Sequence, residues 1–120
     1  MADDSEVERE QVLRTLKREL GDLVVVKTCA TREAVEEIQL RHPNVVVLDI
    51  PTPHRDGIRA LNEIRRKSRS TVIIIFTADP SVVLQELCLE AGANYYLHKT
   101  QLRELIDICS DRFVRTEVRA

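Results

Sequence analysis

The chain has 120 residues and a mass of 13.8 kDa, so we expect one compact domain over residues 1–120. Hydrophobic residues make up 43% and charged residues 32% of it, which indicates a globular rather than a disordered protein. The net charge of −2 and the total of four Phe and Tyr residues argue against direct nucleic-acid binding. We find neither a membrane-length apolar run nor a signal sequence, and therefore expect a cytoplasmic protein without membrane contact.

The first half of the chain predicts two helices and two strands. Apolar residues follow a helical period over residues 6–20 and again over 31–41, where Thr31 is the expected N-cap. Residues 23–26 and 45–48 are short, continuous and mostly β-branched apolar runs. This pattern is typical of strands that are buried on both faces.

The second half continues the alternation. The expected elements are a helix over 57–68, a strand over 72–76, a helix over 81–91, a short strand over 95–97 and a helix over about 100–114. In the fourth helix, Ser81 is the expected N-cap and Gly92 the stop signal, and the apolar residues expected on its inner face are Val83, Leu84, Leu87 and Cys88. The basic end of the third helix, Arg65–Lys67 with Arg69, is expected to be a solvated end that complements the helix dipole.

This alternation predicts an α/β fold with a doubly wound parallel sheet and right-handed crossovers. Such a fold usually begins with a strand, yet only Met1 and Ala2 precede the acidic pair before the first helix. The cysteines, Cys29, Cys88 and Cys109, lie beside apolar residues without metal-ligand spacing, so we expect reduced, buried thiols.

Polar residues follow several of the apolar runs. Asp49 follows the run 45–48, Thr77 the run 72–76, and Lys99 comes soon after the last strand, while Asp3 and Asp4 precede the first helix. The carboxyl ends of parallel strands share one edge of a sheet, where ligands bind. Three carboxylates there would repel one another by a few kcal/mol per close pair at an effective dielectric of about 20, and a hard divalent cation relieves that repulsion.

Mg²⁺ suits these residues best, because it accepts carboxylate, water and phosphate oxygens. A lysine and a hydroxyl supply the cation and hydrogen-bond donor that a transferring phosphoryl group needs, and one carboxylate can act as nucleophile and form an aspartyl phosphate. Each residue alone is weak evidence, since a polar residue after a strand is usually a turn residue. Their ordered occurrence, with Pro53 and Gly57 after Asp49, carries the prediction.

The sequence resembles the receiver domains of two-component response regulators over nearly its whole length. The matching pieces are ADDSEVERE (Ala2–Glu10), VVVLDIPTPHRDG (Val45–Gly57), IIIFTAD (Ile73–Asp79) and AGANYYLHK (Ala91–Lys99). The resemblance implies a flavodoxin-like fold with strand order 2-1-3-4-5 and five helices, and from the length of 120 residues we expect no effector domain. The first strand would be truncated here.

By this resemblance, Asp49 is the phosphoacceptor of a phosphorelay and takes its phosphoryl group from a sensor histidine kinase or a phosphotransfer protein. Asp3, Asp4 and Asp49 would bind Mg²⁺ together with the backbone carbonyl of Pro51. Thr77 and Lys99 would hold the phosphoryl oxygens, and the small Ala78 would leave a path to the acceptor.

Tyr96 matches the switch aromatic that couples phosphorylation to the surface formed by the last strand and the last two helices. That surface is the expected contact with a downstream protein target, and a homodimer is left open. The chain would be a signalling switch that assists its own phosphoryl transfer and dephosphorylation, not an enzyme acting on an outside substrate.

The sequence departs from the family pattern at three places. Thr100 follows Lys99 where many receivers have a cis proline, so the peptide is expected to be trans or strained, because a non-proline cis bond costs roughly 3 kcal/mol. Pro51 and Asp79 flank the approach of water to the acceptor and leave the lifetime of the phosphorylated state open.

The third departure is the missing first strand. Without it, the facing edges of residues 23–26 and 45–48 would keep unpaired backbone groups, each costing about 1–3 kcal/mol when buried. We expect a displaced or truncated start. Otherwise a partner's strand or the tail over residues 113–118 would fill the gap.

The leading alternative is a non-phosphorylated docking module with the same fold, which the intact Asp, Thr and Lys set argues against. A phosphatase of the haloacid dehalogenase type would carry a second aspartate two residues after the nucleophile, where this chain has Pro51. A nucleotide-binding protein is set aside, because the three glycines never cluster into a phosphate-binding loop.

Overall fold

The computed structural model describes residues 6–20, 26–27, 31–48, 55–77 and 81–119. In chain order the elements are α1 (Glu6–Leu20), β1 (Val26–Lys27), α2 (Thr31–Arg41), β2 (Val45–Leu48), α3 (Arg55–Lys67), β3 (Val72–Thr77), α4 (Val82–Glu90), β4 (Tyr95–His98) and α5 (Leu102–Arg119). Each predicted helix and strand has a counterpart, and α5 extends about five residues beyond its predicted end. Of the strand predicted over 23–26, only Val26 lies among the described residues, where it begins β1. Within the described ranges, no helix is long and apolar enough to span a membrane.

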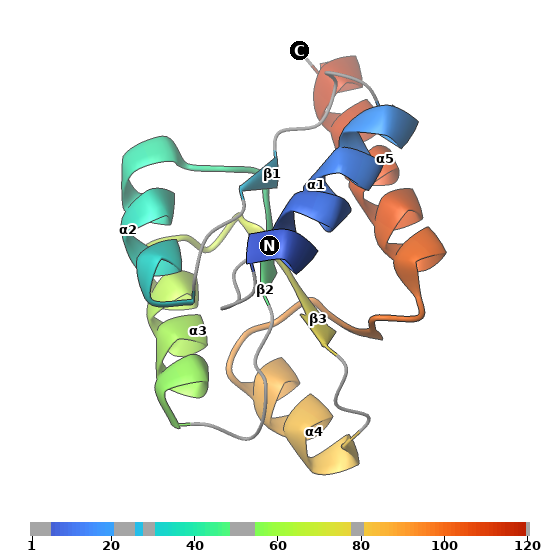
Figure 1. The fold of residues 1–120 in the computed structure, drawn as a ribbon. Coiled ribbons are helices and arrows are strands. Elements are labelled where there is room, and N and C mark those ends of the chain that lie inside the picture. Colours follow the sequence, from blue (N-terminus) through green and yellow to red (C-terminus); the bar gives the residue numbers. More distant parts are fainter. Residues whose placement is uncertain (1–5, 21–25, 28–30, 49–54, 78–80, 120) are drawn as a thin grey trace.

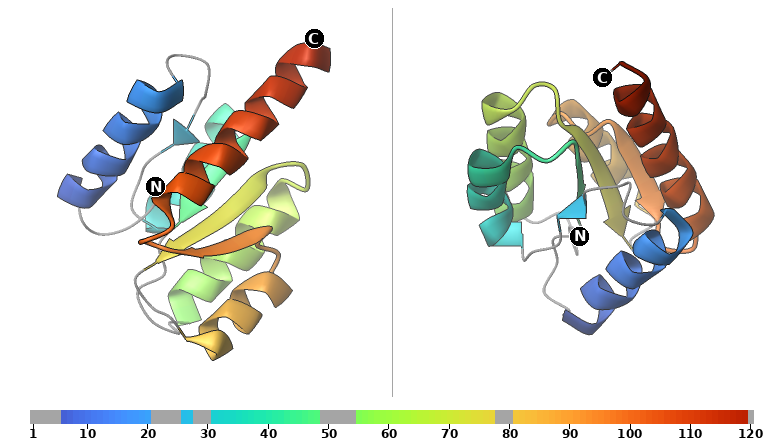
Figure 2. Two further views of the ribbon diagram at one scale, coloured as in Figure 1. Left: turned by 90° about the vertical axis from the view of Figure 1, so that its right-hand side faces the viewer. Right: turned by 90° about the horizontal axis from the view of Figure 1, so that it is seen from above.

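The strands form one parallel sheet in the order β1-β2-β3-β4. Helices cover both of its faces, as Figures 1 and 2 show, which confirms the predicted α/β class. The pairing of β2 with β3 runs from Val45–Val72 to Leu48–Ile75, and that of β3 with β4 from Ile74–Tyr95 to Thr77–His98.

Strand β1 pairs directly with β2, through Val26–Val45 and Lys27–Val46. The sequence predicts a gap between these two strands, at the place of the missing first strand. Among the described residues no strand lies there, and β1 and β2 are direct neighbours instead. This pairing provides backbone partners for Val26 and for Val45 and Val46, whereas residues 23–25 of the predicted edge lie outside the described residues. The tail over residues 113–118 was expected as one way to fill the gap, and that expectation is wrong, since the tail is helical within α5.

The side chains of the sheet alternate between two hydrophobic clusters. One cluster lies toward α2, α3 and α4, and its buried members include Ile38, Val46, Leu61, Ile75 and Leu84. The other lies toward α1 and α5, and its buried members include Leu16, Val47, Ile74, Leu105 and Cys109. Because both faces are covered, β2 and β3 are buried along their whole length, as their apolar runs predicted.

The buried face of helix α4 is narrower than its sequence predicted. Leu84 and Cys88 are fully buried, whereas Val83 is 63% and Leu87 39% exposed. The prediction that Val83 and Leu87 face inward is therefore wrong. Apolar residues surround this helix on several sides, so the pattern alone could not select the buried face. Both predicted end signals are confirmed, because the Ser81 side chain accepts the Leu84 amide and Gly92 has a φ of 117°.

Arg65 also differs from its prediction as a solvated residue. It is half-buried, and burial lowers the pKa of its guanidinium group. The guanidinium group donates to the carbonyl oxygens of Gly92, Ser68 and Arg69 and to Oδ1 of Asn94. Arg65 thus connects the end of α3 to the α4–β4 turn, whereas Arg66 remains exposed as predicted.

Candidate functional site

The carboxyl ends of β2, β3 and β4 lie at one edge of the sheet. Leu48 at the end of β2 pairs with Ile75, and Thr77 at the end of β3 pairs with His98 at the end of β4. This is the edge at which open parallel sheets bind ligands. The residue that follows Leu48 in the chain is Asp49.

Two of the predicted site residues meet at this edge. The backbone amide of Lys99 donates to the carbonyl oxygen of Thr77 at 2.8 Å, one step beyond the last strand pair. Thr77 is 1% exposed and is one of the few buried polar residues in the described part of the chain. The parallel register of β3 and β4 therefore brings Thr77 and Lys99 together, although they are far apart in the sequence.

Lys99 belongs to a tight turn between β4 and α5, which we call the β4–α5 turn (His98–Gln101). The amide of Gln101 donates to the His98 carbonyl at 2.8 Å, and the amide of His98 donates to Oε1 of Gln101 at 2.8 Å. The amide of Thr100 donates to Nδ1 of His98 at 3.2 Å. The described residues contain no cis peptide, so the Lys99–Thr100 peptide is trans, one of the two outcomes expected for it.

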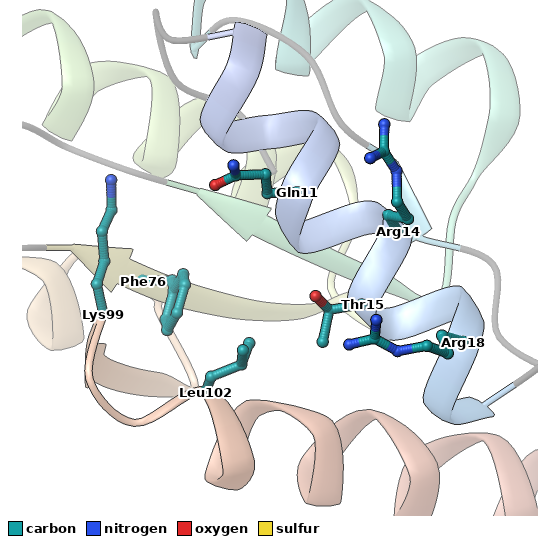
Figure 3. A pocket seen from close by; sticks show the side chains of 7 residues that line it. All are labelled: Gln11, Arg14, Thr15, Arg18, Phe76, Lys99 and Leu102. Carbon is teal, nitrogen blue, oxygen red and sulfur yellow. The ribbon is translucent and has the colours of Figure 1, made fainter.

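Lys99 also lines a pocket of about 410 Å³ between α1, β3 and the start of α5. Figure 3 shows the side chains of α1 on one side and Phe76, Lys99 and Leu102 on the other. Among the described residues, the charged side chains that line this pocket are Arg14, Arg18 and Lys99, all of them cations. These three cations contribute positive potential to the pocket beside Lys99.

The two tyrosines of β4 lie on opposite sides of the sheet. Tyr96 is half-buried and packs against the cluster of α2, α3 and α4, whereas Tyr95 packs against the cluster of α1 and α5. Tyr96 pairs with Ile75, two residues before Thr77. The residue predicted as the switch thus lies on the side of the sheet that carries α4.

The remaining predicted site residues, Asp3, Asp4, Asp49, Pro51 and Ala78, lie outside the described residues, as does Asp79. The described part of the chain contains no group of three or more His, Cys, Asp or Glu side chains that could hold a metal ion. The predicted Mg²⁺ site and the phosphoacceptor therefore stay predictions.

Sequence reasoning missed His98 and Gln101. His98 lies within the matching piece Ala91–Lys99 but received no role there, and Gln101 lies beyond it. Both act through hydrogen bonds within the β4–α5 turn. The signal that could have found them was the threonine after Lys99. A turn without the family's proline needs other means to fix its backbone.

A sequence profile of the response regulator receiver domain matches residues 1–110. The chain belongs to this family. The receiver domains of response regulators are signalling switches rather than classic enzymes. The sequence resemblance is thereby confirmed over most of the chain.

Relatives and solved structures support the assignment. The transcriptional regulatory protein PdtaR of Mycobacterium tuberculosis is 36% identical over 105 residues, which cover 84% of this chain and 51% of PdtaR. The chain thus spans about half the length of this relative. The receiver domain of Francisella response regulator 1452 has a TM-score of 0.75 at 28% identity and covers 96% of this chain and 94% of that one. A LuxR-family DNA-binding response regulator from Staphylococcus aureus has a TM-score of 0.77 at 25% identity, covering 93% and 94%.

Proposed function

We propose that this protein is a phosphoacceptor receiver that takes a phosphoryl group onto Asp49 from a sensor histidine kinase or a phosphotransfer protein. It acts in the cytoplasm and transmits the signal through β4, α4 and α5 to a protein target. The proposal concerns residues 1–120 as one receiver domain, and it includes no direct contact of this domain with nucleic acid.

The hydrogen bond between the Lys99 amide and the Thr77 carbonyl carries this proposal. It fixes the two residues that would hold phosphoryl oxygens at the sheet edge where β2 ends, and Asp49 follows β2 in the chain. Among the described residues, the cations that line the pocket beside Lys99 add attraction for an anionic donor.

In the proposed reaction, a carboxylate oxygen of Asp49 attacks the phosphorus atom of the donor. The new O–P bond forms as the bond from phosphorus to the donor imidazole nitrogen breaks, and the electron pair of that bond returns to the imidazole. The Lys99 ammonium group and the Thr77 hydroxyl stabilise the charge on the equatorial phosphoryl oxygens.

The predicted donors Asp3, Asp4, Asp49 and the Pro51 carbonyl are all oxygen ligands, which suits Mg²⁺. When bound, Mg²⁺ would neutralise the carboxylates and the incoming phosphoryl charge. After transfer, the Thr77 hydroxyl turns toward the new phosphate and Tyr96 turns inward. The surface of β4, α4 and α5 changes with them.

The test is incubation with acetyl phosphate and Mg²⁺, followed by measurement of the intact mass. The mass is measured once under native conditions and once in acid, where an aspartyl phosphate is stable. We expect the wild-type protein to gain one phosphoryl group, and Asp49→Ala to gain none. Asp107→Ala is the matched control, because it removes an exposed carboxylate on α5, and it should be phosphorylated like the wild type. Chelation of Mg²⁺ should abolish the gain.

Failure of the wild-type protein to gain mass with acetyl phosphate, phosphoramidate or a phosphorylated histidine kinase would contradict this function. That result would favour the docking-module alternative. A gain that persists in Asp49→Ala would show that the acceptor is a different residue.

A further inference from the structure

We infer that His98 and Gln101 are positioning residues that hold Lys99 in place for phosphoryl transfer, in the role that a cis proline has in other receivers. This inference rests on the proposed function, because it assigns Lys99 to the phosphoryl oxygens. The family resemblance assigned roles to Tyr96 and Lys99 in this region but none to His98 or Gln101.

The β4–α5 turn is closed by two reciprocal hydrogen bonds between its end residues. Gln101 donates its backbone amide to the His98 carbonyl, and its side-chain Oε1 accepts the His98 amide, both at 2.8 Å. The Gln101 carbonyl also accepts the amide of Leu105 at 3.1 Å, which is a helical hydrogen bond at the beginning of α5. One residue thus connects the end of β4 to the beginning of α5.

The His98 ring fixes the middle of the same turn. Its Nδ1 accepts the Thr100 amide at 3.2 Å and lies 2.9 Å from the Thr100 hydroxyl oxygen. A side-chain acceptor at one residue that takes the amide two residues later is the geometry of an Asx turn, here formed by an imidazole. Because Nδ1 accepts an amide proton, it carries no proton in this arrangement.

These contacts replace what a proline would supply. A cis proline at the third position of a turn fixes the backbone through its ring. Thr100 occupies this position with a trans peptide and leaves the backbone freer, so the side chains of His98 and Gln101 must fix it. The backbone amide of Lys99 donates to the Thr77 carbonyl oxygen. The hydrogen bonds of the β4–α5 turn fix the backbone on both sides of Lys99.

Four variants test the assignment. His98→Ala removes the ring acceptor, and His98→Asn restores an acceptor in true Asx-turn geometry. Gln101→Met keeps the length of the side chain but removes its acceptor oxygen. Gln39→Ala is the control, since Gln39 is an exposed residue of α2 remote from the turn.

The first measurement is the rate of phosphorylation by acetyl phosphate with Mg²⁺, followed by intact mass over a range of donor concentrations. We expect His98→Ala and Gln101→Met to lower the limiting rate about tenfold, because misplacement of a catalytic group by a fraction of an ångström has effects of this size. His98→Asn and Gln39→Ala should stay within about twofold of wild type. Circular dichroism at the assay temperature gives the folded fraction of each variant.

The second measurement is amide hydrogen exchange by NMR. His98→Ala should speed exchange of the Thr100 amide, and Gln101→Met that of the His98 amide, whereas His98→Asn should keep the Thr100 amide protected.

Wild-type phosphorylation with unchanged rates in His98→Ala and Gln101→Met would overturn the positioning role and leave the proposed function intact. A loss in His98→Asn equal to that in His98→Ala, or losses that only follow the folded fraction, would also overturn it. A wild-type protein that accepts no phosphoryl group would instead refute the proposed function, and the positioning role with it.

Discussion

The Nε atom of Arg65 donates a hydrogen bond to the carbonyl oxygen of Gly92 at 3.0 Å, across 27 residues of sequence. The same guanidinium group reaches Oδ1 of Asn94 at 2.7 Å, and that oxygen also accepts the Ile73 amide at 2.8 Å. Arg65 therefore links α3, the α4–β4 turn and the beginning of β3. These contacts lie at the edge of the sheet opposite to Thr77 and Lys99.

Arg65→Lys should destabilise the protein. Lysine has one ammonium group and cannot reach acceptors on Gly92, Asn94 and the end of α3 at once. We expect the free energy of unfolding in urea to fall by about 0.5–1.5 kcal/mol, since partly buried acceptors lose hydrogen bonds. Arg66→Lys is the matched control, because the exposed pair of Arg66 with Glu63 is long at 3.6 Å. The control should change stability by less than about 0.5 kcal/mol, and equal effects of the two variants would contradict the role of Arg65.

Gly92→Ala should also destabilise the protein, for a steric reason. A Cβ atom at Gly92 would lie 2.7 Å from Cγ and 2.9 Å from Cβ of Arg65, and the φ of 117° is strained for any residue with a side chain. We expect a loss of about 1–3 kcal/mol in chemical denaturation. Gln85→Ala, an exposed substitution in α4, serves as control and should be close to neutral. A stable Gly92→Ala protein would show that the turn adopts another conformation.

Adjacent substitutions in α4 should have very different effects. Leu84→Ala removes a fully buried side chain and should cost about 2–5 kcal/mol of unfolding free energy. Val83→Thr changes a side chain that is 63% exposed and should cost less than about 0.5 kcal/mol. Thermal unfolding followed by circular dichroism checks both, and a large loss of stability in Val83→Thr would show that the Val83 side chain is buried.

The buried thiols predict a loss of stability at high pH. Burial raises the pKa of Cys88 and of Cys109 from 9.0 to about 11. Between these values the unfolded chain ionises and the folded protein does not, so the free energy of unfolding falls as the pH rises from about 9 to about 11.

We expect the free energy of unfolding to fall by about 1–2 kcal/mol per thiol over this pH range. Urea denaturation at several pH values measures it. The variant Cys88→Ala/Cys109→Ala is the control, because other groups titrate in the same range. Its stability should depend less steeply on pH above about 9. Parallel curves for the two proteins would show that these thiols do not contribute.

The sheet and its site edge could be predicted from the sequence because the relevant information is local. The runs Val45–Leu48 and Val72–Phe76 are buried throughout, so continuous apolar character was sufficient to identify them. The position of Thr77 and Lys99 followed from strand ends alone, since parallel strands place their carboxyl ends together.

Other features depend on tertiary contacts that no local pattern contains. The apolar residues of α4 surround the helix, so only its packing against the sheet decides that Leu84 is buried and Val83 is exposed. Likewise, nothing next to Arg65 in the sequence indicates that its partners are Gly92 and Asn94. The turn contacts of His98 and Gln101 depend on side-chain geometry within four residues, which composition does not determine.

The pairing of β3 with β4 has a consequence for how the protein tolerates insertions and deletions. A single register places Lys99 beside Thr77 and turns Tyr96, not Tyr95, toward the side of α4. A shift of β4 by one residue would exchange the two tyrosines between the faces of the sheet and at the same time move the lysine away from the threonine. The proposed chemistry at the sheet edge and the proposed signalling through its face therefore both depend on the register of β4, and a shift of this strand would disturb both.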